Sequence, residues 1–313
     1  MRPHSICVAG SINVDLIAYL DTATDTARYA EGKAFGMSAG GKSLNTAMTI
    51  AALGPVQLVG RVGADDFGSF IARTLTTADI TTTGLIIDGG AGTGIGHIRV
   101  SAEGEYDTVV IPGANGNFSP EDVDHILQDG EIPEYAVLNL EVPLRTSIHA
   151  ARRFAASGSK VVLNLSPIQD GAKELLSLVD IVVLNREEAQ LVLDQPNQHD
   201  PDVLLGALQE AGASAAVLTL GSEGAAYIDS EGHAGVVKGK PVPVVNSIGA
   251  GDTFLGAFVS ALALGQSFKD ALGFADAAGR IVCGKATSYL ERIDCRDLEQ
   301  IQPFHDHGWK LLP

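Results

Sequence analysis

Short apolar segments alternate with helical segments along most of this chain, and this alternation restricts the fold more than any other feature of the sequence. Strands separated by helices predict a doubly wound, mostly parallel α/β sheet. No proline- or serine-rich linker divides the chain, so we expect one domain over residues 1–313. The apolar segments have the length of buried strands and span 6–9, 56–59, 135–140, 160–165, 181–184 and 215–220.

Two regions depart from this alternation and predict a second, smaller sheet. Residues 18–38 are polar with few helix signals, and residues 93–112 show the pattern of a hairpin with a turn at 102–104. We group about 14–38 and 93–112 as an accessory β-sheet. Residues 222–245 are typical of a β-meander, and two helices are expected after it, around 253–264 and 268–285.

The charge balance and the cysteines exclude several classes of protein. The formal net charge of −17 argues against a nucleic-acid or acidic-membrane surface. No apolar run reaches the roughly 18 residues of a membrane-spanning helix, and we see no signal peptide. Neither the histidines nor Cys7, Cys283 and Cys295 have metal-ligand spacing. A cytoplasmic protein without membrane or nucleic-acid partners is therefore expected.

The strongest candidate for chemistry lies within residues 244–264. An extended apolar approach leads to Gly249 and Gly251, and a helical pattern follows from Thr253. The free N–H groups of such a turn, together with the helix dipole, favour an anion. Beside a bound phosphate, Asp252 would suit a base that removes a proton from an attacking hydroxyl. The alternative is that Asp252 only caps the helix.

Polar residues also follow other predicted strands. Asn13 and Asp15 come after the first strand, where side chains face the ligand crevice of an α/β sheet, although a polar turn would read the same way. Asn185 and Glu188 have the spacing of a capping box, and Glu188 could also hold Mg²⁺ through water. Residues 219–224 could run along a nucleotide or form a hairpin turn.

Residues 36–43, GMSAGGKS, fit the phosphate-loop pattern completely. That pattern has meaning only between a buried strand and a helix. The residues just before it, 29–34, are too polar for a central strand. We therefore do not expect a phosphate loop here, although a P-loop NTPase stays as an alternative class.

Taken together, these motifs resemble those of the ribokinase-like (PfkB) carbohydrate kinases, over residues 6 to about 283. Their order and spacing are more specific than any single motif. The resemblance is carried by GSINVD at 10–15, GGKSLNTA at 40–47, PGANGNFSPEDV at 112–123, LEVPL at 140–144, NREEAQ at 185–190, TLGSEG at 219–224 and IGAGDTFLGAF at 248–258.

The resemblance implies an αβα sandwich whose accessory sheet is a lid over a sugar and also a homodimer interface. It implies that Asp252 is the base, with the N–H groups of Gly249, Ala250 and Gly251 stabilising the transferring phosphoryl group. It implies a sugar site at Asn13, Asp15, Gly41, Lys42, Asn45, Glu141 and Asp252. It implies an ATP site at Asn185, Thr219, Gly221, Ser222, Gly224, Gly251 and Asp276, with Mg²⁺ held through water by Glu188.

Several positions depart from the family pattern. Ser43 and Leu44 stand where small Gly and Ala are usual, and Leu44 could narrow or reshape the sugar pocket. A monovalent cation such as K⁺ would lie near Asn246 and Ile248, but Asn246 replaces a common Asp. Residues 284–290 depart too, so weak or absent K⁺ activation is predicted. Asp276 replaces a frequent His near adenine.

The resemblance implies an enzyme that transfers the γ-phosphoryl group of ATP to a hydroxymethyl group of a small sugar. Ribose is the first choice, because GGK together with PGANGNFSPEDV is most similar to ribokinases. A fructokinase, a nucleoside kinase or another pentose or hexose kinase remains open. A catalytically silent sugar or nucleotide binder is the alternative of another class, and the presence of both Asp252 and Glu188 argues against it.

Overall fold

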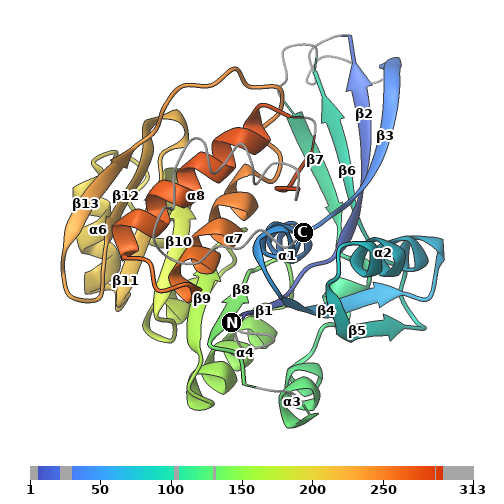
Figure 1. Cartoon of the computed structure of the whole chain (residues 1–313), viewed down its shortest axis with the longest axis horizontal. Helices are drawn as coiled ribbons and strands as arrows, with labels where there is room; N and C mark the ends of the chain where they lie inside the picture. The colour runs from blue at the N-terminus through green and yellow to red at the C-terminus, as the bar shows by residue number, and fades with distance from the viewer. Residues whose placement is uncertain (1–5, 22–29, 102–105, 130–131, 286, 292–313) are drawn as a thin grey trace.

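The computed structural model describes residues 6–21, 30–101, 106–129, 132–285 and 287–291, and the account below concerns these residues. They form a large sheet with helices on both faces and a small sheet that stands above one edge of it (Figure 1). The turn predicted at 102–104 and Cys295 lie outside the described residues. Within the described ranges, no helix combines the length and apolarity needed to cross a bilayer.

The large sheet has nine strands in the order β13-β12-β11-β10-β9-β8-β1-β4-β5. All pairs from β5 to β11 are parallel, and only the pairs β11–β12 and β12–β13 are antiparallel. This confirms the doubly wound, mostly parallel sheet. The strands are β1 Ile6–Ala9, β4 Gln57–Gly63, β5 Thr81–Asp88, β8 Tyr135–Leu138, β9 Lys160–Asn164, β10 Ile181–Asn185, β11 Ala215–Thr219, β12 Gly224–Ile228 and β13 Ala234–Lys238.

The sequence missed one strand of this sheet and shortened another. β5 is an edge strand of sequence TTTGLIID, and it has no continuous apolar run because only part of it is buried. β4 continues to Gly63, past the exit expected at Gly60. The strands that the sequence did predict are the central ones, whose burial on both faces requires an apolar run.

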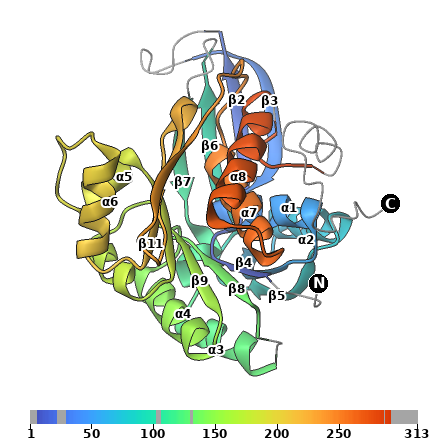
Figure 2. The same ribbon diagram turned by 60° about the vertical axis from the view of Figure 1, so that its left-hand side comes forward.

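The helices divide into two layers that cover opposite faces of the large sheet (Figure 2). One core cluster contains residues of α1, α2, α7 and α8, and the other contains residues of α3, α4, α5 and α6. The bounds are α1 Lys42–Leu53, α2 Asp66–Thr77, α3 Pro120–Asp129, α4 Leu144–Ala156, α5 Arg186–Val192, α6 Pro201–Glu210, α7 Ala250–Ala263 and α8 Phe268–Cys283, with 3₁₀ helices η1 Gly113–Asn117, η2 Ala172–Ser177 and η3 Gly221–Glu223.

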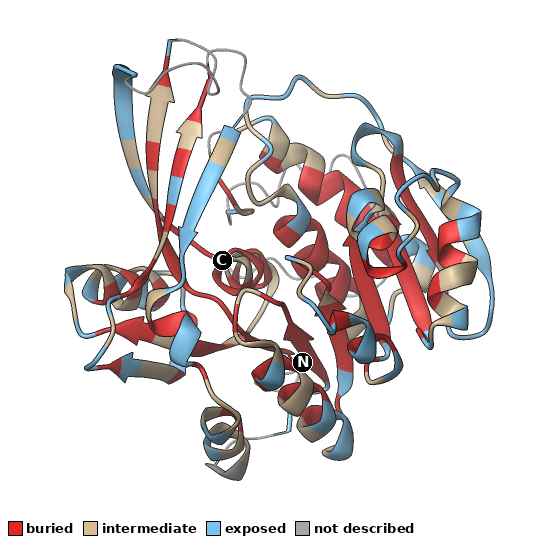
Figure 3. Ribbon diagram, turned by 180° about the vertical axis from the view of Figure 1, so that it is seen from behind, coloured by how far each residue is buried: buried red, intermediate tan, exposed pale blue. Residues whose placement is uncertain are grey.

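The small sheet has the order β3-β2-β6-β7, and it matches the accessory sheet predicted from about 14–38 and 93–112. Residues 22–29 and 102–105 of that prediction lie outside the described residues. The edge strand β7 is largely exposed, whereas the central strands of the large sheet are buried (Figure 3). The strands are β2 Asn13–Leu20, β3 Gly32–Gly40, β6 Gly94–Val100 and β7 Tyr106–Ile111.

Two glycines fix the position of α7. Gly249 precedes the helix with φ of 73°, and a Cβ on it would collide with the carbonyl oxygen of Ser288. Gly256 packs α7 on α1, because a Cβ there would lie 2.8 Å from the carbonyl oxygen of Thr46. The helix begins at Ala250 rather than at the expected Thr253. Its free N–H groups therefore belong to the first turn, which contains Asp252.

Candidate active site

A cavity of about 670 Å³ lies between the small sheet and the carboxyl edge of the large sheet, the edge at which its parallel strands end. Its lining comes from separate parts of the chain: the start of β2, the first turn of α1, the segment after β8 and the first turn of α7. Parallel strands direct the segments that follow them to one edge, which brings these residues together. Every residue of the predicted sugar site lines it: Asn13, Asp15, Gly41, Lys42, Asn45, Glu141 and Asp252.

The small sheet contributes the roof of the cavity. On β7, the lining residues Tyr106, Thr108 and Val110 alternate along the strand, as side chains on one face must. Gly40 and Gly96, on either side of β2, leave room for the carboxylate of Asp15, which a Cβ on either glycine would meet. The Asp15 carboxylate is thus held close against the roof, with only 5% of the residue exposed.

Asp252 lies in the first turn of α7, but it does not cap the helix. Gly249 occupies the cap position, without a side-chain hydrogen bond. The carboxylate instead accepts hydrogen bonds from two amides: Asn45 Nδ2 lies 3.0 Å from Oδ2, and Asn164 Nδ2 lies 3.4 Å from Oδ1. The capping interpretation of Asp252 is therefore wrong, and two amide groups orient the carboxylate.

Burial and mutual repulsion perturb the ionisable groups of the cavity. Burial, then the charges of Glu141 and Asp252, raise the pKa of Asp15 to about 7. Burial also raises the pKa of Asp252, to about 6, against the opposing charge of Lys42 and the hydrogen bond from Asn45. Burial opposes the charged form of Lys42, yet the carboxylates around it raise its pKa. Lys42 therefore stays positive and compensates part of the negative charge of the cavity.

Two buried acceptors in the cavity wall have no hydrogen-bond partner among the described residues. They are Oδ1 of Asn45 and Oε2 of Glu141. A buried acceptor without a donor costs about 1–3 kcal/mol. Ligand hydroxyl groups would satisfy both atoms. The cavity is thus suited to a small polyhydroxylated ligand rather than to an apolar one.

The residues predicted to contact ATP lie outside the lining of this cavity, along the carboxyl edge beside it. Asn185 and Thr219 are paired in register at the ends of β10 and β11, and Gly221 and Ser222 are exposed in η3. Gly224 is buried at the start of β12, where a Cβ would collide with the carbonyl oxygen of Val237. Residues 219–224 therefore form a turn into an antiparallel pair, and their contact with a nucleotide stays a prediction.

Three of the predicted ligand residues already have protein partners. Asn185 and Glu188 form the full capping box of α5, with both hydrogen bonds at 2.8 Å. The charge of Glu188 also reaches Lys42 and Asp252, which places it near the cavity. Asp276 accepts a hydrogen bond of 2.8 Å from Arg280 Nε on the same helix. If Asp276 contacts ATP as predicted, its carboxylate would bind ATP and Arg280 at the same time.

The phosphate-loop pattern does not have the structural context that it needs. Residues 36–40 belong to β3, an exposed edge strand of the small sheet, and not to a buried strand of the parallel one. Lys42 does begin a helix, but its side chain lines the cavity together with Asp252. The expectation that these residues are no phosphate loop agrees with this arrangement.

The expectation for Leu44 is wrong. Leu44 is fully buried in the core beneath α1 and is not part of the cavity wall, because the residue faces the large sheet. The Ser43 hydroxyl is likewise buried and accepts a hydrogen bond of 2.6 Å from Asn139 Nδ2. Asn139 also accepts from the backbone N–H of Glu141 at 2.9 Å. Ser43 thus supports the segment that carries Glu141.

Sequence reasoning missed Asn139 and Asn164. Asn139 comes directly after β8, and Asn164 ends β9. Both therefore carry the same signal as Asn13, a polar residue where a buried strand ends. Asn164 contacts Asp252, and Asn139 supports Glu141, so both act on the cavity.

The chain matches the family model described as pfkB family carbohydrate kinase over residues 3–292. It is 31% identical to a ribokinase of Staphylococcus aureus over 290 residues, 90% of this chain and 94% of that protein. It is 30% identical to a ribokinase of Haemophilus influenzae over 280 residues, 88% of this chain and 91% of that one.

A solved structure has the same fold. It is that of Arabidopsis thaliana ribokinase complexed with ribose and ATP, with a TM-score of 0.80 at 24% identity. The match covers 97% of this chain and 100% of that one.

The raised pKa of Asp15 predicts that stability depends on pH. Because the folded pKa of about 7 exceeds the ordinary 3.8, stability from this group is complete below the lower value and is lost as the pH rises through about 7. We expect the unfolding free energy of the parent to fall by roughly 2–4 kcal/mol more between about pH 4 and pH 8 than that of Asp15→Asn. Urea unfolding across this range measures it, with Asp170→Asn, an exposed position, as control. Parallel curves for the parent and Asp15→Asn would contradict it.

Proposed function

The chain belongs to the pfkB family of carbohydrate kinases, and we propose that it phosphorylates ribose with ATP as the donor. The observation that carries the proposal is the convergence of seven predicted sugar-binding residues on one cavity, with Asp252 at its helix N-terminus. The ribokinases of Staphylococcus aureus and Haemophilus influenzae are at least 30% identical over most of both chains.

In the proposed reaction, Asp252 takes the proton of the sugar hydroxymethyl group. The freed oxygen forms a bond to the γ-phosphorus of ATP, the bond from that phosphorus to its bridging oxygen breaks, and ADP leaves with the electron pair. The N–H groups of Gly249, Ala250 and Gly251 stabilise the charge on the transferring group, and Lys42 adds a positive charge beside Asp252. Of these donors, Ala250 N–H would exchange its bond of 3.3 Å to the carbonyl oxygen of Ser247 for the phosphoryl group. A carboxylate whose pKa is about 6 is ionised at neutral pH and still accepts a proton readily.

We propose that the nucleotide lies along the carboxyl edge of the large sheet, over Asn185, Thr219 and η3. When bound, Mg²⁺ would neutralise charge on the phosphates of ATP, and such an ion keeps several waters as ligands. Glu188 fits an outer contact to such an ion: one oxygen is used in the capping box, and its charge reaches Asp252. Mg²⁺ would thus be held mainly by phosphate and water.

The charge of the cavity favours a free sugar over a sugar phosphate. Asp15, Glu141 and Asp252 line the cavity together with one cation, Lys42, so a second phosphate on the acceptor would be repelled. A fructokinase or a nucleoside kinase shares this chemistry and stays as the alternative. A protein that only bound sugar or nucleotide, without catalysis, would not need a carboxylate that two amides orient beside a helix N-terminus.

The first test is turnover of ribose and its dependence on Asp252. With ATP and Mg²⁺, the parent should phosphorylate ribose with a higher kcat/KM than fructose, adenosine or ribose 5-phosphate. Asp252→Asn should lower kcat by roughly 10²–10⁴-fold, because the base is lost, while ribose binding measured by calorimetry largely survives. The parent kcat/KM should fall below about pH 6, as Asp252 becomes protonated.

Near-parent turnover by Asp252→Asn would refute the role of the base. A sugar phosphate that outperformed every free sugar would refute the substrate class.

We also propose that K⁺ activates this enzyme weakly or not at all. The amide of Asn246 is already used: Oδ1 accepts from Ile248 N–H at 2.6 Å, and Nδ2 donates to the carbonyl oxygen of Lys285 at 3.3 Å. Asn246 thereby links the segment before α7 to the segment after α8. A cation beside the first turn of α7 would link the same two segments. A neutral amide whose oxygen is occupied is a poor ligand for a hard cation.

Initial rates in sodium-free buffer, with K⁺ raised from zero, should therefore be nearly flat. Asn246→Asp should introduce a K⁺ response, because it restores a carboxylate ligand. A saturable, several-fold rise in parent kcat at low K⁺ concentration would contradict the proposal.

We further propose that the outer face of the small sheet forms a homodimer. The face of β3 and β7 that points away from the cavity carries exposed apolar side chains. Phe35 is 70% exposed and Val109 is 59% exposed, and Met37 and Ile111 lie on the same face two residues further along their strands. Both strands, β3 and β7, are edges with unpaired backbone groups.

Light scattering should find a dimer for the parent and a monomer for Phe35→Glu/Val109→Lys. Leu191→Lys, at an exposed apolar position on α5, is the matched control and should leave the mass unchanged. A monomeric parent at micromolar concentration would reject this interface.

A further inference from the structure

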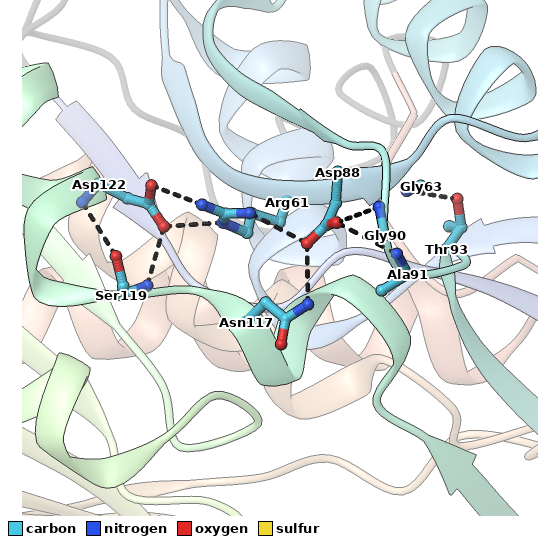
Figure 4. Close-up of polar contacts among 9 residues, drawn as sticks. All are labelled: Arg61, Gly63, Asp88, Gly90, Ala91, Thr93, Asn117, Ser119 and Asp122. Atoms are coloured by element: carbon cyan, nitrogen blue, oxygen red, sulfur yellow. Dashed lines mark hydrogen bonds and ion pairs between the residues drawn. The ribbon is translucent and has the colours of Figure 1, made fainter.

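The 3₁₀ helix η1 directly follows the last strand of the small sheet, and its two asparagines have different partners. Asn115 is 1% exposed and contacts Ile12 and Asn13 at the cavity. Asn117 contacts Asp88 instead, at the end of β5 (Figure 4). One short helix therefore connects the wall of the cavity with a polar cluster outside it.

The hydrogen bonds of Asn115 determine which way its amide points. Its Oδ1 accepts from the backbone N–H of Ile12 at 2.9 Å, so its Nδ2 carries both donors. Nδ2 lies 3.1 Å from the carbonyl oxygen of Ile12 and 2.8 Å from Oδ1 of Asn13. Since a backbone N–H can only donate, this arrangement has a single orientation.

The same bonds determine the orientation of Asn13. Its Oδ1 is occupied by Asn115, so the group that Asn13 retains for a ligand is the NH₂ donor. The packing leaves little freedom, because a Cβ on Gly94 would collide with both Asn115 Nδ2 and Asn13 Oδ1. Asn13 therefore offers donors to the cavity, whereas its neighbours Asp15 and Glu141 offer acceptors.

We propose that Asn115 is a positioning residue for sugar recognition, which holds Asn13 as a hydrogen-bond donor to a sugar hydroxyl oxygen. The proposal rests on the sugar kinase function argued above and adds a residue outside the cavity lining. A site with donors and acceptors at fixed places discriminates hydroxyl patterns, because a mismatched ligand leaves buried polar groups unpaired.

The other side of η1 has partners of its own. Asp88 accepts from Asn117 Nδ2 at 2.9 Å and from Arg61 at 3.0 Å, and Arg61 also binds Asp122 at 2.8 Å (Figure 4). These bonds connect β4, the end of β5 and the first turn of α3 with η1. Asn117 thus belongs to the same helix as Asn115 but has no contact with Asn13, which makes it a matched control.

A double-mutant cycle tests the proposal. Asn115→Ser should raise the ribose KM by roughly 10- to 100-fold with a smaller change in the ATP KM and in kcat, because the orientation of Asn13 is lost. In an Asn13→Ala background, Asn115→Ser should raise the ribose KM further by less than about threefold, because its only route to the sugar is already removed. Asn117→Ser should keep the parent ribose KM.

A second variant keeps the test decisive if Asn115→Ser does not fold. In Asn13→Asp, the carboxylate still accepts the bond from Asn115, so the fold is preserved, but it offers an oxygen where the parent offers NH₂. Its ribose KM should rise as much as that of Asn13→Ala.

Additive effects in the cycle, an equal effect of Asn117→Ser, or a parent-like ribose KM for Asn13→Asp would overturn the proposal. Failure of the proposed sugar kinase function would give a different result, because the parent protein would then phosphorylate no free sugar. The positioning role of Asn115 would then be rejected as well.

Discussion

The buried charge of Lys42 is the interaction on which the cavity depends. The charges of Asp252, Glu141 and Glu188 act on this cation, and Asp15 lines the same cavity. Burying a carboxylate without compensation costs several kcal/mol, so a cation beside it stabilises its ionised form. Lys42 holds the pKa of Asp252 below what burial alone would give. Burial, then the charges of Glu141 and Asp252, raise the pKa of Asp15 to about 7. The cation thus favours the ionised form of Asp252, the form that the proposed general base requires.

Close backbone packing brings the helices that carry Lys42 and Asp252 together. Lys42 and Asn45 belong to α1 and Asp252 to α7, and the two helices approach through Gly256. The bond from Asn45 to Asp252 bridges them at 3.0 Å. A larger residue at position 256 would separate the helices and lengthen this bond. Gly256, in the motif at 248–258, thus has a packing role that does not depend on a bound phosphate.

The sequence predicted what depends on local pattern. The central strands and the small sheet were correct because burial on both faces leaves a clear signal. The residues predicted to bind a sugar do line one cavity, but their contact with a sugar stays a prediction. β5 was missed because an edge strand needs no apolar run. Leu44 was misplaced because the sequence does not show which face of α1 meets the sheet. Asn164 and Asn115 act through partners far away in the chain, Asp252 and Ile12, and no local pattern reports such a contact. The roles of the site residues in chemistry stay predictions.

The choice of asparagine for these supporting positions follows from the charge of the cavity. Asn45 and Asn164 orient Asp252, Asn139 supports Glu141, and Asn115 orients Asn13. A lysine or arginine in such a place would neutralise the base, and an acid would raise its pKa further. An amide donates and accepts with fixed geometry and adds no charge. In a cavity with three carboxylates and one cation, to which ATP adds more negative charge, only neutral groups can hold the reacting carboxylate in place without changing whether it is ionised.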